Sequence, residues 1–146
     1  MTQAQTLTRT PGGQFTKGEV VAETTHHITR ESLVRYAGAA GDFNTIHYND
    51  SAAEDAGLPG VLAHGMLTAA LALHTVTDWL GGDTTRIRSY ETRFTRPVVV
   101  DPVAGAHVVV TAKVGKVDTD TLRIDLTVTC EDTTVLGKTQ ATITFP

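Results

Sequence analysis

Residues 65–80 constrain the fold of this chain more than any other segment, because they would form a helix that is apolar on nearly every side. The apolar residues of this segment include Met66, Leu67, Ala69, Ala70, Leu71, Ala72, Leu73, Val76 and Trp79. A helix without a polar face has to be enclosed by protein. Gly81 and Gly82 follow it as a natural C-terminal cap. Its longest apolar stretch is far shorter than the roughly 20 residues that cross a bilayer, so we interpret it as core and expect no membrane contact.

Before this helix, the sequence predicts one strand, one short helix and a long connection. Residues 18–28 are rich in Val and Thr and alternate loosely, which is typical of a strand. Thr29 would then cap a short helix that ends at Gly38 and Gly41. The connection that follows favours a single helical turn at residues 51–54.

After the central helix, strand patterns occupy residues 86–98, 106–117, 121–130 and 134–145. In the third of these, apolar and polar residues alternate strictly from Leu122 to Thr129, which indicates a sheet with one face in water. The order of strand, short helix, long connection, buried helix and four strands predicts an α+β fold. In this fold an antiparallel sheet wraps around one long central helix.

Size and composition narrow the class of protein. With 146 residues, of which 40% are hydrophobic, the chain has the size of one domain with a real core. We expect residues 1–14 to form a flexible leader and residues 15–146 a single domain. The net charge of −4 gives no positive field, so we expect no nucleic-acid partner. The single cysteine, Cys130, excludes an internal disulfide framework, and residues 1–14 lack the apolar core of a signal peptide. These features predict a cytoplasmic enzyme or binding protein.

The candidate chemistry lies just before the apolar helix, in the sequence Gly-Asp-Phe-Asn-Thr-Ile-His at residues 41–47. Asp42 and His47 stand five positions apart, which places them about 140° apart on a helix and on opposite faces of a strand. Gly41 and Asn44 favour turns. We therefore expect Asp42 and His47 to converge on an irregular loop. The alternative is that Asp42 and Asn44 only cap a turn while His47 is an ordinary half-buried histidine.

Gly65 adds a third element at the start of the apolar helix. A helix N-terminus offers free N–H groups and the positive end of the helix dipole, and glycine lets a ligand approach this backbone closely. Removal of a proton next to a thioester carbonyl builds an enolate oxyanion, which such N–H groups stabilise. An acid, a base and a helix start are sufficient to add water to an acyl thioester or to eliminate water from it.

These motifs resemble those of the MaoC-like (R)-specific enoyl-thioester hydratases and dehydratases, which have the hot-dog fold. The resemblance covers about residues 15–145 and rests on Tyr36-Ala37-Gly38 and on residues 41–47, 63–68 and 93–98. The strongest likeness is to the B-subunit type of the heterodimeric (3R)-hydroxyacyl-carrier-protein dehydratases of mycolic acid synthesis, which is also a single hot dog.

The resemblance implies a role for four residues. Asp42 and His47 would form the acid/base dyad, Asn44 would be a polar organiser at the substrate site, and the N–H of Gly65 would bind the thioester carbonyl. The implied reaction interconverts (3R)-3-hydroxyacyl and trans-2-enoyl thioesters of coenzyme A or acyl carrier protein, without cofactor or metal. Which dyad member is the acid stays open. Because a single hot dog leaves a strand edge and part of its helix exposed, we expect a homodimer or a heterodimer with a related hot-dog subunit.

Several other residues carry weaker signals. The family usually has proline where Thr45 stands, and its absence removes a φ restraint from the loop. His64 would be a structural histidine or a supporting donor, and we place it outside the catalytic set. A zinc site made of His64 with Asp42 and His47 has suitable ligand types but no supporting spacing. Four arginines would meet the phosphates of coenzyme A or an acidic carrier, or would only solvate a strand edge: Arg86, Arg88, Arg93 and Arg96.

Two other functions remain open from the sequence. Many hot-dog thioesterases use a carboxylate on the central helix, but here that helix offers only Asp78, far from Gly65. A non-catalytic acyl-binding subunit is the second alternative, although the presence of both dyad residues argues against it. Thr68 would line the pocket or simply bond back to its own helix, and we expect Tyr36 and Trp79 to belong to the core.

Overall fold

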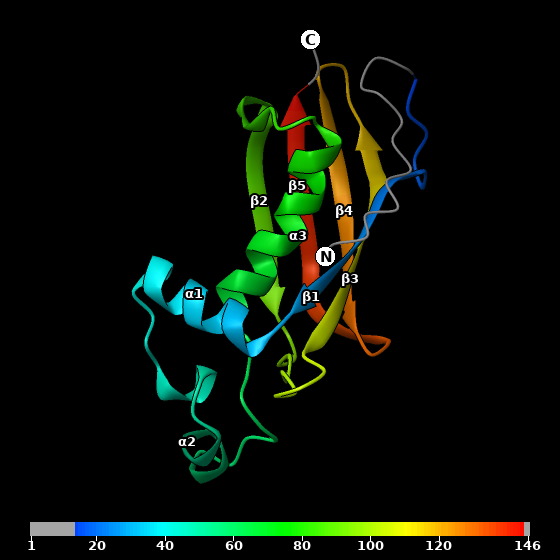
Figure 1. The fold of residues 1–146 in the computed structure, drawn as a ribbon. Helices are drawn as coiled ribbons and strands as arrows, with labels where there is room; N and C mark the ends of the chain where they lie inside the picture. The colour runs from blue at the N-terminus through cyan, green and yellow to red at the C-terminus, as the bar shows by residue number, and fades with distance from the viewer. Residues whose placement is uncertain (1–13, 145–146) are drawn as a thin grey trace.

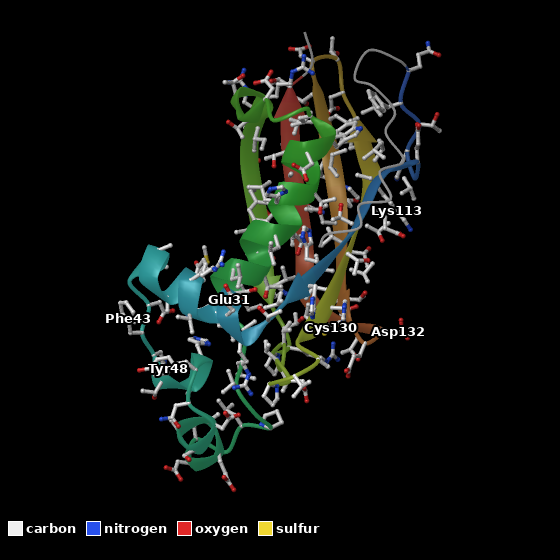
Figure 2. All side chains as sticks on the ribbon, viewed as in Figure 1. Glu31, Phe43, Tyr48, Lys113, Cys130 and Asp132 are labelled. Carbon is white, nitrogen blue, oxygen red and sulfur yellow. The ribbon has the colours of Figure 1, made fainter. Side chains whose placement is uncertain are left out.

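The computed structural model describes residues 14–144, in which a five-stranded antiparallel sheet lies against one long helix (Figure 1). The strands lie in the order β1-β3-β4-β5-β2, with the bounds β1 Val20–Ile28, β2 Ile87–Phe94, β3 Ala106–Val117, β4 Thr121–Cys130 and β5 Thr133–Thr144. The helix is α3 (Gly65–Trp79), which begins at the residue that the sequence indicates. This arrangement confirms the predicted α+β hot-dog architecture. The predicted leader lies outside the described residues except for its last position, so the division of the chain stays a prediction.

The core lies between α3 and the face of the sheet toward it. From the helix it takes Ala69, Ala72, Val76 and Trp79, and from β4 it takes Leu122, Ile124, Leu126 and Val128. On the opposite face of β4, the guanidinium of Arg123 donates to the carboxylate of Asp125 at 2.8 Å. The alternation predicted for β4 is therefore confirmed.

One face of α3 is exposed in the single chain, as we expect for a hot dog without its partner subunit. Met66 is 62% exposed, and Ala70 and His74, each one helical turn further on, are exposed as well. A sheet covers only one side of a helix. The short helix α1 (Arg30–Ala40) reaches α3 near its N-terminal end, where Tyr36 packs on His64 (Figure 1). The rest of the open face is left to solvent in a single chain.

Helix α1 carries the chain from β1 to the loop that holds Asp42. Thr29 caps it as predicted: its hydroxyl accepts from the N–H of Ser32, whose hydroxyl in turn accepts from the N–H of Thr29. The helix ends at Gly41, which has a left-handed φ of 70° and donates its N–H to the oxygen of Ala37 at 2.9 Å. Gly38 lies inside the helix and does not end it, because the single residue in left-handed conformation comes later.

Strand β2 is shorter than the predicted 86–98, and its early end shapes the site. The N–H groups of Thr95 and Arg96 both donate to the oxygen of Val135 at 3.2 Å, after which the chain leaves the sheet. Pro97 follows and has no N–H for a strand ladder. The chain then runs beside the segment that leads into α3, where the N–H of Ala63 donates to the oxygen of Val98 at 2.8 Å. The end of β2 is thereby held next to the start of α3.

A second bond joins β2 to α3. The hydroxyl of Tyr90 donates to the main-chain oxygen of Ala69 at 2.8 Å. Burial raises the pKa of Tyr90 to about 12, so the hydroxyl keeps its proton, and with it this hydrogen bond, throughout the neutral range.

Across residues 14–144, we find no helix with the length and hydrophobicity needed to cross a membrane. The cytoplasmic location that the sequence indicates stays a prediction.

Replacing Thr29 by alanine should lower the free energy of unfolding by about 1 kcal/mol, the usual effect of losing an N-cap side chain. Two hydrogen bonds of the capping box depend on this hydroxyl and its geometry. Urea denaturation measures the change, and Thr119→Ala, at an exposed position in the turn between β3 and β4, is the matched control. Equal stability of the two variants would contradict the capping role.

Candidate active site

The loop after α1 is built by local side-chain to backbone bonds. The carboxylate of Asp42 accepts from the N–H of Asn44 at 3.3 Å. The side-chain oxygen of Asn44 accepts from the N–H of Ile46 at 3.3 Å and caps the short 3₁₀ helix η1 (Thr45–His47). The turn-capping alternative for Asp42 and Asn44 is thus part of the structure. It coexists with a site, because the capped turn is what carries His47.

His47 has a defined tautomer. Its Nδ1 lies 2.7 Å from the main-chain oxygen of Leu62, and since a carbonyl oxygen only accepts, Nδ1 carries the proton in the neutral ring. The lone pair is therefore on Nε2. Leu62 is itself fixed to the same turn, because its N–H donates to the oxygen of Ile46 at 3.1 Å. The ring of His47 is half-buried, and the hydrogen bond to Leu62 fixes its orientation.

Asp42 and His47 converge, as the loop argument predicts. One ligand-type atom from each of Asp42, His47 and His64 lies within 4.8 Å of the other two. Asp42 is exposed, His47 is half-buried and His64 is buried. A carboxylate and an imidazole five positions apart therefore meet without sharing a regular element.

The start of α3 is left open on the side of the site. His64 occupies the N-cap position, but its side chain makes no capping hydrogen bond to the first turn. The first N–H groups of a helix have no partner within the helix. Gly65 is exposed, so the open helix start is accessible.

A pocket of about 340 Å³ joins His47 to this helix start. It is lined by His47, Leu62, Ala63, Gly65, Thr68, Phe94, Thr95, Arg96, Pro97, Val98 and Leu136. Thr68 lines the pocket and its hydroxyl also donates back to the oxygen of His64 at 3.4 Å, so both expectations for this residue hold. Asn44 does not line the pocket, and its position in the turn is that of an organiser. The roles of Asn44, Gly65 and Thr68 toward a substrate stay predictions.

Phe94 is a site residue that the sequence did not single out. Its ring lies over Gly65: a Cβ at that glycine would meet ring carbons of Phe94 at 3.0 and 3.1 Å. The side chain is 53% exposed, so it lies at the edge of the pocket. Phe94 belongs to the motif at residues 93–98, but only the contact across the fold, between the end of β2 and the start of α3, reveals its place.

The four arginines do not form one cluster. Arg88 and Arg93 stand five positions apart on β2, which separates their main chains by roughly 15 Å. Arg86 pairs with Asp83 near the start of β2, whereas Arg96 lines the pocket and donates to the oxygen of Thr134 at 3.1 Å. Because a strand spreads its residues along its length, Arg96 lies at the pocket while Arg86 lies near the other end of β2, and contact of these arginines with a carrier stays a prediction.

The ring geometry argues against a metal at Asp42, His47 and His64. The two imidazoles are stacked, with centroids 3.8 Å apart and planes 25° from parallel. Two histidines that bind one zinc ion point nitrogen lone pairs at a common centre about 2 Å from each. In stacked rings the nitrogen lone pairs lie in two nearly parallel planes and do not converge on one point. The stacked arrangement of the two rings therefore does not favour coordination of one metal ion by both histidines.

The family model described as a MaoC like domain matches residues 13–134. The chain belongs to this family. Among curated proteins, 3-hydroxyacyl-thioester dehydratase X of Mycobacterium tuberculosis is 42% identical over 81 residues, which are 56% of this chain and 28% of that protein. The chain therefore spans less than a third of the length of this relative.

Solved structures share the fold over nearly the whole chain. A MaoC-like dehydratase superposes with a TM-score of 0.87 at 31% identity, covering 94% of this chain and 44% of that one. The R-hydratase PhaJ1 from Pseudomonas aeruginosa has a TM-score of 0.79 at 28% identity, covering 93% and 85%. A chain of the ChsH1-ChsH2 complex from Mycobacterium tuberculosis has a TM-score of 0.78 at 20% identity, covering 90% and 100%, and shows the fold alone.

Proposed function

We propose that this chain catalyses the reversible hydration of trans-2-enoyl thioesters to (3R)-3-hydroxyacyl thioesters. One observation supports this most: Asp42 and His47 converge next to the open start of α3, and His47 and Gly65 line the same pocket. Membership of a dehydratase family, and relatives named as a dehydratase and an R-hydratase, support the same reaction class.

The chemistry requires that the dyad carry one mobile proton between its two members. In dehydration, the unprotonated member takes the proton from C2 while the protonated member gives its proton to the leaving 3-hydroxyl, which departs as water. The double bond forms between C2 and C3, and the dyad ends with one proton, as it began. Nε2 of His47 is the ring atom that gains or loses this proton, since Nδ1 is engaged with Leu62.

The main-chain N–H of Gly65 would stabilise the negative charge that develops on the thioester oxygen in this step. Loss of the C2 proton moves negative charge to the thioester oxygen, and a main-chain N–H at a helix start is positioned for it without reorganisation. The exposure of Gly65 and the missing side-chain cap at His64 leave this N–H available.

Hydrolysis of the thioester has less support from the geometry. Asp78, the carboxylate of α3, lies about 20 Å along the helix from Gly65 and faces His74 at 3.0 Å. Mixing the protein with crotonyl-coenzyme A distinguishes the functions. Hydration removes the absorbance of the conjugated enoyl thioester and releases no thiol, a thioesterase releases thiol, and an acyl-binding subunit changes neither.

The carrier of the acyl group would be coenzyme A or acyl carrier protein. Both present a phosphopantetheine arm, and Arg96 offers a guanidinium at the wall of the pocket where the arm would leave it. No nucleic acid, cofactor or metal enters this proposal.

We further propose that the chain pairs with a second hot-dog subunit, either a copy of itself or a related chain. β2 is an end strand of the sheet, and Met66, on the uncovered face of α3, lines the same surface hollow as Tyr90 of β2. Open strand edges are usually covered by another chain. The ChsH1-ChsH2 neighbour is a complex of two chains.

Light scattering on the isolated protein should therefore report a dimer. A protein that stays monomeric but gains activity on mixing with a related hot-dog subunit would support the heterodimer. An isolated chain that is both monomeric and fully active would contradict the pairing.

A further inference from the structure

His64 lies at the centre of the candidate active site, yet the chemistry above gives it no part. It is only 1% exposed. Its ring lies between two others, with centroid distances of 3.8 Å to His47 and 4.7 Å to Tyr36. In the chain it directly precedes Gly65. The side chain of His64 thus contacts His47 of the proposed dyad. The backbone of His64 leads directly into the helix start that would bind the thioester carbonyl.

The hydrogen bond of His64 reaches the other dyad residue. Nε2 lies 3.1 Å from the main-chain oxygen of Asp42. Because this oxygen only accepts, the proton is on Nε2 in the neutral ring. His47 has the opposite tautomer, with its proton on Nδ1 toward Leu62. Each of the two stacked rings therefore donates a hydrogen bond to a backbone carbonyl, and the two carbonyls belong to different segments. The hydrogen bond from His64 holds the loop that carries the Asp42 carboxylate.

His64 is a poor choice for stability alone. Its Nδ1 is buried and has no hydrogen-bond partner among the described residues, and an unpaired buried acceptor is destabilising. At an N-cap position, Ser, Thr, Asp or Asn would bond to the first turn of the helix. His64 does not. Its side chain points toward the dyad loop instead, and the helix start stays open.

We propose that His64 is the positioning residue of this active site. It holds the main chain of Asp42, provides the surface on which the His47 ring lies, and sets both at a fixed place relative to the N–H of Gly65. This inference rests on the proposed hydratase function for its kinetic test. It does not make His64 a catalytic residue, since no proton of the reaction passes through it.

Two substitutions separate the hydrogen bond from the ring contact. His64→Phe keeps a ring between Tyr36 and His47 and removes the donor to Asp42. His64→Gln keeps an N–H donor and removes the ring. We expect His64→Phe to lower kcat about 10- to 100-fold, the scale of a small misplacement of catalytic groups, while KM changes less than about threefold. His64→Gln should have a higher kcat than His64→Phe, because its side-chain N–H can again donate a hydrogen bond to the main-chain oxygen of Asp42.

The matched control is His107→Phe, which makes the same change at an exposed position of β3 that does not line the pocket and where the ring stacks on His27. We expect its kcat and KM to equal those of the unchanged protein. A merely structural role for His64 would instead lower the melting temperature and the yield of active protein in His64→Phe, with kcat per active site unchanged. That outcome, or full kcat/KM in a normally folded His64→Phe protein, would overturn the proposal.

Nitrogen-15 NMR of the unchanged protein tests the same proposal without any variant or any substrate. At neutral pH it should show His64 protonated on Nε2 and His47 protonated on Nδ1. An Nδ1-protonated His64 would contradict the tie to Asp42. Because this readout does not depend on turnover, it remains decisive if a variant fails to fold, and it separates a failure of this inference from a failure of the hydratase proposal.

Discussion

Asp42→Asn and His47→Ala should each lower kcat for enoyl-thioester hydration by about 100-fold or more, the usual size of general acid–base effects. Asparagine keeps the size of the Asp42 side chain and an oxygen for the N–H of Asn44, so the turn should survive. Alanine removes the ring that carries the mobile proton at Nε2. Steady-state kinetics measures both losses, and circular dichroism on the same samples checks the fold.

The double variant tells whether the two residues act as one unit. Groups that share one proton are not additive, so Asp42→Asn combined with His47→Ala should be hardly worse than the worse single variant. Losses that multiply would indicate independent roles. Unchanged turnover in either single variant would remove the proposed dyad altogether.

Gly65→Ala should reduce kcat/KM by about 10²- to 10³-fold, the effect of losing one oxyanion donor. A methyl group at this helix start would intrude where the thioester oxygen must lie. It would also approach the Phe94 ring at 3.0 Å, but that ring is 53% exposed and free to turn outward. Alanine is the better helix former, so thermal melting should show a normally folded protein. Gly65→Val, with a larger branched side chain, should be more severely impaired.

Phe94→Ala is the control that separates loss of the oxyanion donor from displacement of the ring. If Gly65→Ala loses activity because Phe94 is displaced, Phe94→Ala alone should lower kcat/KM to the same extent. We expect the Phe94→Ala protein to retain most of its activity and the Gly65→Ala/Phe94→Ala double variant to stay impaired. Full kcat/KM in a normally folded Gly65→Ala protein would move the oxyanion site elsewhere.

Local patterns in the sequence predicted most of the fold. The strict alternation along β4 and the apolar segment after Gly65 indicated a strand and the central helix close to their observed bounds. The capping role of Thr29 is likewise a matter of the few residues next to it. Such features depend on backbone geometry within one element, and periodicity records them directly.

Features that depend on distant segments were not predictable in the same way. The stack of His64 on His47 requires that η1 and the start of α3 meet, and the position of Phe94 over Gly65 requires that β2 end next to that helix. An exposed part of α3 was expected for a single hot dog, but which residues lie on that face depends on how the sheet packs against the helix. The convergence of Asp42 and His47 was predictable because turn residues lie between them.

The most direct test of the central claim uses the two enantiomers of a 3-hydroxybutyryl thioester as substrates, with the protein in its active assembly. We expect conjugated enoyl absorbance to rise with the (3R) enantiomer alone, and the rise to be lost in Asp42→Asn and in His47→Ala. Enoyl formation from the (3S) enantiomer, equal formation by the dyad variants, or release of free thiol without enoyl formation would contradict the central claim.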